Sequence, residues 1–134
     1  MDRLFLDANV LFSAAYRADA GVTRLWRLPG PTLHNSDYAV EEARRNLSDI
    51  VQLDRLDVLI RDVQRVPAGS LDLASRQGVL LPEKDWPIVA GALAARATHL
   101  ITGDLQHFGP YFGKELLGVL VLAPAAYLRS RSES

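Results

Sequence analysis

The sequence predicts an α/β fold in which helices cover both faces of a parallel sheet. Short apolar segments typical of strands alternate along the chain with longer segments that have helical periodicity. The strand segments are apolar throughout rather than at every second residue, as expected for strands that are buried on both faces. At 134 residues the chain can form one domain with a sizeable core.

Four strands are expected, each a short apolar run next to a turn signal. They cover residues 3–6, 32–34, 99–102 and 118–122. The carboxyl ends of parallel strands meet at one edge of the sheet, where ligands bind in open sheets of this kind. Two of these strands are followed there by an aspartate, Asp7 directly and Asp104 after Gly103.

Helices are expected where apolar residues recur at helical spacing. The clearest covers residues 86–97, which are rich in alanine and carry Pro87 in the permissive first turn. Ser36 is a suitable N-cap for a helix over about residues 37–51. Further helical segments are expected at residues 10–16, 22–28 and 54–66, after Pro124, and in part of 70–84.

Composition limits the classes of protein that fit. We expect a single domain over residues 1–128 and a frayed polar tail over 129–134. The net charge of −1 excludes a global positive field. All but two of the 15 basic residues are arginine, which binds phosphate with two donors, although a GC-rich coding sequence explains the same bias. The absence of cysteine excludes disulfides, zinc–thiolate sites and thiol nucleophiles.

The amino-terminal segment is neither a signal peptide nor a membrane span. Its apolar run is interrupted by Asp7 after a few residues, and no later apolar run is long enough to cross a bilayer. We therefore expect a cytoplasmic protein without a membrane partner.

Three aspartates are candidates for one functional site. Asp7 and Asp104 follow buried strands, where a partly desolvated charge is costly unless it is paired or bound to a metal. Asp85 precedes the helix expected at residues 86–97, and two interpretations remain open for it. It is either the N-cap of that helix or a further acid of the same cleft.

Glu41 and Glu42 compete for a fourth acidic position. Glu41 has the spacing of a surface ion pair with the arginines that follow it. Glu42 lies nearer the buried edge of its helix, where Asn46 is placed to orient it, so we favour Glu42. Carboxylates without cysteine or paired histidine suit Mg²⁺ or Mn²⁺ better than zinc. Such an ion activates water and neutralises phosphodiester charge, which indicates a nuclease that chelation inactivates.

With these residues identified, the chain resembles the PIN-domain ribonucleases, which include toxins of bacterial and archaeal toxin–antitoxin systems. The resemblance runs from Leu4 to about Leu122 and rests on the segments LFLDANVLFSA, SDYAVEEARRNL, KDWPIVAGALAARATHLITGDLQHF and GVLVLAP. It implies a three-layer α/β/α sandwich with a parallel sheet of four or five strands. It also implies Mg²⁺- or Mn²⁺-dependent endonucleolytic hydrolysis of RNA.

The resemblance also implies roles for single residues. The catalytic and metal-binding acids would be Asp7, Glu42, Asp85 and Asp104. Asn9, beside the first acid, is a candidate for substrate binding, and Thr102 would contact metal-bound water or phosphate. His107 is not a required ligand of the family and is either a phosphate or leaving-group contact or polar surface. A homodimer is usual in the family, and an antitoxin partner is expected if the chain is a toxin rather than a stand-alone protein.

Two other functions compete with the nuclease. A phosphatase of the haloacid dehalogenase class also begins with a strand that ends in aspartate, but it needs a second aspartate where this chain has Asn9. The other alternative is a catalytically weak or inactive PIN-fold module that binds RNA or a partner protein. The presence of all four acids argues against that module.

Overall fold

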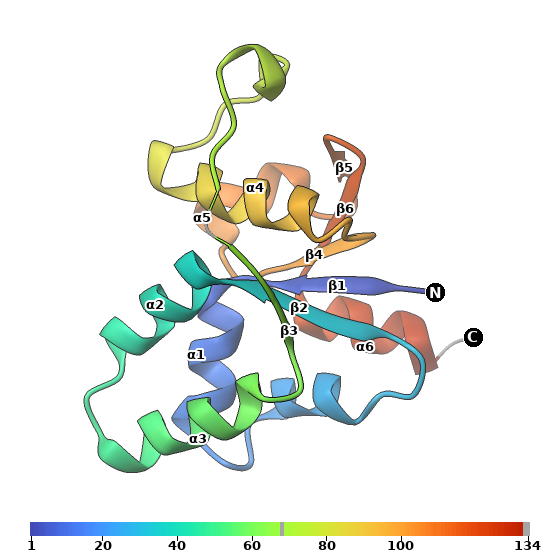
Figure 1. Cartoon of the computed structure of the whole chain (residues 1–134). Coiled ribbons are helices and arrows are strands. Elements are labelled where there is room, and N and C mark those ends of the chain that lie inside the picture. Colours follow the sequence, from blue (N-terminus) through green and yellow to red (C-terminus); the bar gives the residue numbers. More distant parts are fainter. Residues whose placement is uncertain (68, 133–134) are drawn as a thin grey trace.

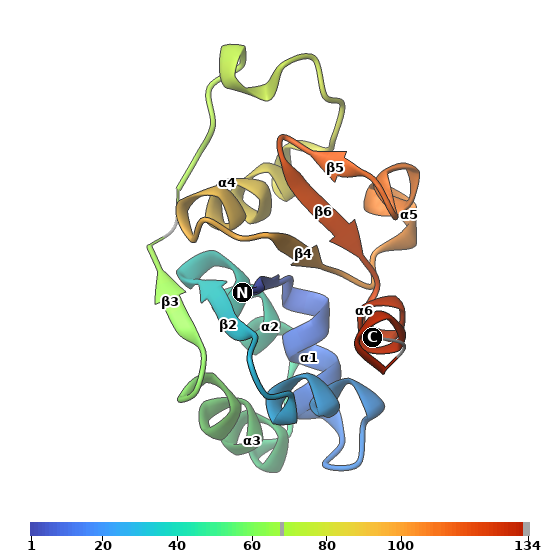
Figure 2. The same ribbon diagram turned by 90° about the vertical axis from the view of Figure 1, so that its right-hand side faces the viewer.

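The computed structural model describes residues 1–67 and 69–132 and confirms the expected α/β fold. Within these residues the sheet has six strands in the order β3-β2-β1-β4-β6-β5 (Figure 1). Neighbouring strands are parallel except β5, which is antiparallel to β6 (Figure 2). The strands are β1 (Arg3–Leu6), β2 (Thr32–Ser36), β3 (Gln64–Val66), β4 (His99–Ile101), β5 (Glu115–Leu116) and β6 (Val119–Leu122).

Two of these strands correct the expectation of four or five. The residues of β3 fall within the helix expected over residues 54–66, but the helix in the structure runs from Ile50 to Ile60 and the chain then returns to pair with β2. β5 forms a hairpin with β6 through Leu117 and Gly118, whose φ angles are 52° and 87°. Both angles are positive, as a tight hairpin turn requires. A leucine at such a position gives no turn signal in the sequence.

The helices begin largely where expected but several are shorter. They are α1 (Ala8–Tyr16), α2 (Asp37–Asn46), α3 (Ile50–Ile60), α4 (Trp86–Ala94), α5 (Leu105–Phe108) and α6 (Pro124–Ser132). Turns of 3-10 helix lie at Gly21–Arg27, Ala74–Arg76, Glu83–Asp85 and Gly109–Tyr111.

Two further helix boundaries differ from the expected ones. The helix expected over residues 37–51 ends at Asn46, because Leu47 is extended and the Asp49 carboxylate accepts a hydrogen bond from Val51 N at 2.7 Å to begin α3. The expected frayed tail is helical through Ser132 as part of α6, and residues 133–134 lie outside the described residues. No helix in the described part of the chain has the length and apolar character needed to cross a membrane.

The helices form two layers around the sheet. α4 lies on one face, and α1, α3 and α6 lie on the other (Figure 1). α4 approaches the sheet closely at Gly91, where an added Cβ would lie 2.7 Å from the Phe5 ring. α2 packs against α1 and also contacts α4, so it lies beside the edge at which the parallel strands end. The residues that follow β1 and β4 therefore face α2 and the beginning of α4.

Candidate functional site

Asp7 is buried where β1 ends and α1 begins, and both of its oxygens accept hydrogen bonds. Only 4% of the residue is exposed. Oδ1 accepts a hydrogen bond from Ala8 N at 2.6 Å, and Oδ2 accepts from Thr102 Oγ1 at 2.8 Å and from Asn9 Nδ2 at 3.1 Å. These bonds fix the orientation of the carboxylate.

The charge of Asp7 is nevertheless unfavourable in this position. Burial raises its pKa, against the hydrogen bonds from Thr102 and Ala8, which lower it. The carboxylates of Asp85 and Glu42 also raise it, and the net result is a pKa of about 6. The three acids are thus close enough to repel one another, and a cation between them would relieve that repulsion.

Asn9 and Thr102 join the turns that follow β1 and β4. Asn9 Oδ1 accepts a hydrogen bond from Gly103 N at 2.8 Å, and Thr102 Oγ1 accepts one from Asp104 N at 3.1 Å. Thr102 therefore contacts the backbone of Asp104 and the carboxylate of Asp7 through one hydroxyl. This arrangement orients both acids, while contact of Asn9 and Thr102 with substrate stays a prediction.

Asp85 precedes α4, but helix capping does not explain the position of its carboxylate. The residue is 8% exposed and occupies the N-cap position, yet its carboxylate makes no capping hydrogen bond. Its Oδ2 lies instead 2.8 Å from His107 Nδ1. Burial raises the pKa of Asp85, His107 and Lys84 lower it, and the carboxylates of Asp104 and Glu42 raise it again.

Asp104 is the N-cap of the short helix α5, which contains His107. Asp104 Oδ1 accepts a hydrogen bond from His107 N at 3.1 Å, and its Oδ2 lies 3.0 Å from His107 Nδ1. His107 therefore lies between the carboxylates of Asp85 and Asp104. One donor atom from each of these three residues, which we call the Asp85–Asp104–His107 cluster, falls within 4.8 Å of the others. This cluster can offer ligands to a metal ion.

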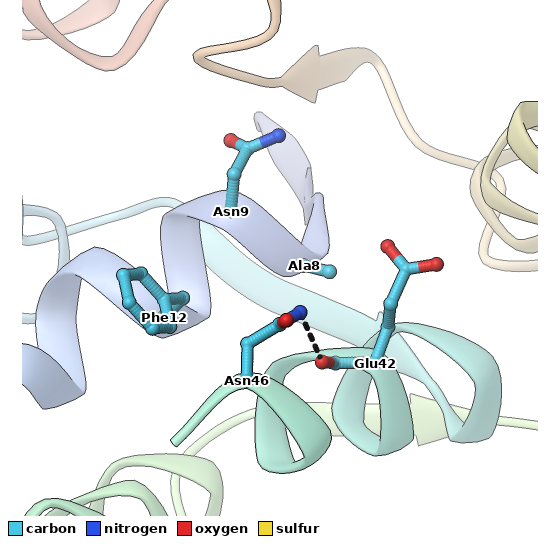
Figure 3. A pocket seen from close by; sticks show the side chains of 5 residues that line it. All are labelled: Ala8, Asn9, Phe12, Glu42 and Asn46. Atoms are coloured by element: carbon cyan, nitrogen blue, oxygen red, sulfur yellow. Dashed lines mark hydrogen bonds between the residues drawn. The ribbon is translucent and has the colours of Figure 1, made fainter. Parts of the chain in front are cut away.

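Glu42 reaches the cleft from α2, whereas Glu41 is exposed. Figure 3 shows the Glu42 side chain rising beside Ala8 at the start of α1. It borders a pocket of about 320 Å³ lined by Ala8, Asn9, Phe12, Glu42 and Asn46 (Figure 3).

Two expectations about the neighbours of these glutamates are wrong. Asn46 Nδ2 donates to the backbone oxygen of Glu42 at 2.9 Å and not to its carboxylate, so it closes α2 rather than orienting the acid. Arg44 forms its ion pair with Asp57 of α3, at 3.0 Å, rather than with Glu41.

Tyr38 is a site residue that the sequence analysis did not single out. Its hydroxyl donates to the backbone oxygen of Lys84 at 2.8 Å and so ties α2 to the turn that carries Asp85. Burial raises the pKa of Tyr38, and the neighbouring Glu42 carboxylate raises it further. The sequence does contain a pattern that points to Tyr38: it precedes Glu42 by four residues and therefore lies on the same helix face.

Comparisons with known proteins identify the fold. No family model matches the chain, and no curated protein matches its sequence. The chain is similar to one in the crystal structure of VapBC2 from Rickettsia felis bound to a DNA fragment from their promoter. The TM-score is 0.64 at 15% identity, over 90% of this chain and 98% of that one. For VapBC-1 from nontypeable Haemophilus influenzae the TM-score is 0.59 at 15% identity, over 92% and 98%. The PIN-like fold implied by the sequence resemblance is thereby confirmed.

Proposed function

We propose that the protein is a metal-dependent endoribonuclease in which four carboxylates hold Mg²⁺ or Mn²⁺. The acids are Asp7, Glu42, Asp85 and Asp104. The observation that carries the proposal is the arrangement of these acids at the carboxyl edge of the sheet. Asp85 and Asp104 lie close enough together to bind one ion, and Asp7 and Glu42 are near enough to Asp85 to interact with it electrostatically. Acids that repel one another, two of them buried, suit a divalent ion.

The residues of the chain have separable tasks in this reaction. A divalent ion supplies an activated water and neutralises charge on the phosphodiester. Thr102 and Asn9 hold the Asp7 carboxylate in one orientation through hydrogen bonds of 2.8 and 3.1 Å. Tyr38 holds the turn before Asp85 through its hydrogen bond to Lys84 O, and Glu42 of α2 lines the pocket beside the site. Without the ion, the same acids would repel an RNA phosphate.

We further propose that the protein is a toxin that an antitoxin partner inhibits. Support comes from the fold that it shares with chains of two VapBC toxin–antitoxin structures. Co-expression with the products of the adjacent reading frames tests this role. We expect one of them to copurify with the protein and to suppress its ribonuclease activity, and the toxin role is rejected if none does either.

Cleavage of labelled RNA by the purified protein tests the enzymatic proposal. We expect cleavage with Mn²⁺ or Mg²⁺ and none with EDTA. The Glu42→Gln variant should lose on the order of 10²–10³-fold in rate, because it removes charge that acts in the transition state. Glu41→Gln is the matched control: it makes the same change one residue away at an exposed position, and its rate should be unchanged.

Two results would contradict the proposal. Equal losses in the two glutamine variants would remove Glu42 from the site. Absence of metal-dependent cleavage of any RNA or DNA tested, in protein shown to be folded, would favour a binding module instead.

A further inference from the structure

We infer that His107 Nδ1 is a direct ligand of the metal ion held by Asp85 and Asp104, and that this nitrogen makes the site select Mn²⁺ or another transition-metal ion over Mg²⁺. The inference rests on the metal site of the proposed function, but it goes beyond the four carboxylates by adding a nitrogen donor. It also differs from both alternatives left open for His107 by the sequence, a phosphate or leaving-group contact and polar surface.

The spacing of the three donor atoms is that of neighbouring ligands on one ion. His107 Nδ1 lies 2.8 Å from Asp85 Oδ2 and 3.0 Å from Asp104 Oδ2. Two ligands at right angles with bonds of about 2.1 Å are about 3.0 Å apart. Asp85 precedes α4, Asp104 is the N-cap of α5, and His107 lies within α5.

At 2.8 and 3.0 Å, His107 Nδ1 lies at ion-pair distance from both carboxylates, but these ion pairs form only when the ring is protonated. Among the described residues, Asp85 Oδ2 and His107 Nδ1 are buried side-chain atoms without a hydrogen-bond partner, although they are only 2.8 Å apart. Buried polar atoms without partners are rare and costly in folded proteins. A metal ion would satisfy both atoms at once.

The backbone holds His107 in this position. Asp104 is the N-cap of α5, and its Oδ1 accepts the hydrogen bond from His107 N at 3.1 Å. A residue three positions after the cap faces the cap again after one helical turn. The His107 side chain is 19% exposed, so its ring has little freedom to turn away. The nitrogen is therefore presented to the cluster before an ion binds.

A nitrogen donor changes which ions the cluster favours. Mg²⁺ is a hard ion that takes oxygen ligands and keeps several waters. Imidazole suits transition-metal ions, and affinity for sites with nitrogen and oxygen donors rises from Mn²⁺ towards Co²⁺ and Ni²⁺. The Asp85–Asp104–His107 cluster should therefore bind Mn²⁺ more tightly than Mg²⁺, and Co²⁺ more tightly than Mn²⁺.

The test is pulsed electron paramagnetic resonance of the protein loaded with Mn²⁺, without RNA. Electron spin echo modulation detects nitrogen bound directly to Mn²⁺, and ¹⁵N-histidine labelling assigns that nitrogen. We expect the signal in the unaltered protein and its loss in His107→Asn, whose amide oxygen stands near the position of Nδ1. His99→Asn is the matched control, because His99 packs against Tyr127 of α6 and should leave the signal unchanged.

Competition between Mg²⁺ and Mn²⁺ gives a second readout. His107→Asn should lower the ratio of Mn²⁺ to Mg²⁺ affinity at least about tenfold. Absence of a nitrogen signal in the unaltered protein, or an unchanged ratio in the variant, would overturn the inference even if RNA is cleaved. A histidine nitrogen on Mn²⁺ without RNA cleavage would instead retain the inference and reject the proposed function. Melting of each variant in EDTA shows that it is folded.

Discussion

Strand β1 has an aspartate next to each end, and the two aspartates have opposite surroundings. Asp2 Oδ2 accepts a hydrogen bond from Tyr127 OH at 2.6 Å and lies 3.9 Å from Arg131 Nη1. Asp7 also accepts hydrogen bonds, but the charged groups that act on it are the carboxylates of Asp85 and Glu42. One aspartate is near a cation, and the other is among anions.

The same difference holds for the two edges of the sheet. At the amino edge, Arg3 Nε and Nη2 donate to Ala95 O at 3.0 and 2.8 Å, and Thr98 Oγ1 exchanges hydrogen bonds with the Arg3 backbone. At the carboxyl edge, Asp85 Oδ2 and His107 Nδ1 have no hydrogen-bond partner within the part of the chain that the structure describes. The amino edge thus supports the fold, whereas the carboxyl edge retains repulsion that a ligand would relieve. Local conflict of this kind is expected at functional sites.

Replacing the aspartate at each end of β1 by asparagine is the strongest test of the difference between the two edges. Asp7→Asn should lower the rate of metal-dependent RNA cleavage on the order of 10²–10³-fold. Asp2→Asn should leave the rate unchanged, because an asparagine oxygen still accepts the hydrogen bond from Tyr127 OH. Initial rates at saturating Mn²⁺ measure both effects. Similar losses in the two variants would show that the edges do not differ in function.

The pH dependence of stability tests whether the Asp7 charge is unfavourable. The pKa of Asp7 is raised from 3.8 to about 6, so between these pH values the folded protein binds more protons than the unfolded chain. The free energy of unfolding should therefore fall as pH rises through this window, by about 3 kcal/mol for this group. Denaturant titrations in EDTA measure this fall.

Asp7→Asn should lack that contribution, because its side chain does not titrate. Relative to the unaltered protein, the variant should gain about 3 kcal/mol between about pH 4 and about pH 8. A difference in the free energy of unfolding that is constant with pH would mean that Asp7 has an ordinary pKa. Its charge would then not be unfavourable at the carboxyl edge.

Thr102→Val tests the hydroxyl that joins the two strand-end turns. The substitution keeps the shape of the side chain but removes the hydrogen bond to Asp7 Oδ2 and the acceptor for Asp104 N. We expect metal affinity to fall about 10–100-fold, as for other groups that orient metal ligands. Calorimetric titration with Mn²⁺ measures it. An unchanged affinity would show that Asp7 and Asp104 hold their positions without Thr102.

Tyr127→Phe should have the smallest effect, and only on stability. It removes the hydrogen bond to Asp2 at the amino edge while the buried ring keeps its packing. Loss of one such bond to a charged group should lower the free energy of unfolding by about 1.5–3 kcal/mol. Metal affinity and cleavage rate should not change, and a change in either would link the two edges.

The sequence by itself determined the fold class and where β1, β2, β4 and β6 lie along the chain. Short apolar runs and turn residues are local signals, and buried parallel strands leave them clearly. Ser36 was also predictable as a cap, since its side chain accepts a hydrogen bond from Ala39 N three residues ahead, at 3.2 Å. The positions of Asp7 and Asp104 at the ends of their strands followed in the same way.

Only the tertiary structure decided the features that depend on contacts between distant segments. β3 and β5 exist because they pair with β2 and β6, and pairing energy overrides weak local preference. Tyr38 reaches the backbone of Lys84 from another helix. Asp85 has the sequence of a cap, but its carboxylate faces His107 instead, and no local pattern records that contact between residues 22 positions apart. The chemistry at the carboxyl edge is therefore set by where α4 and α5 come together.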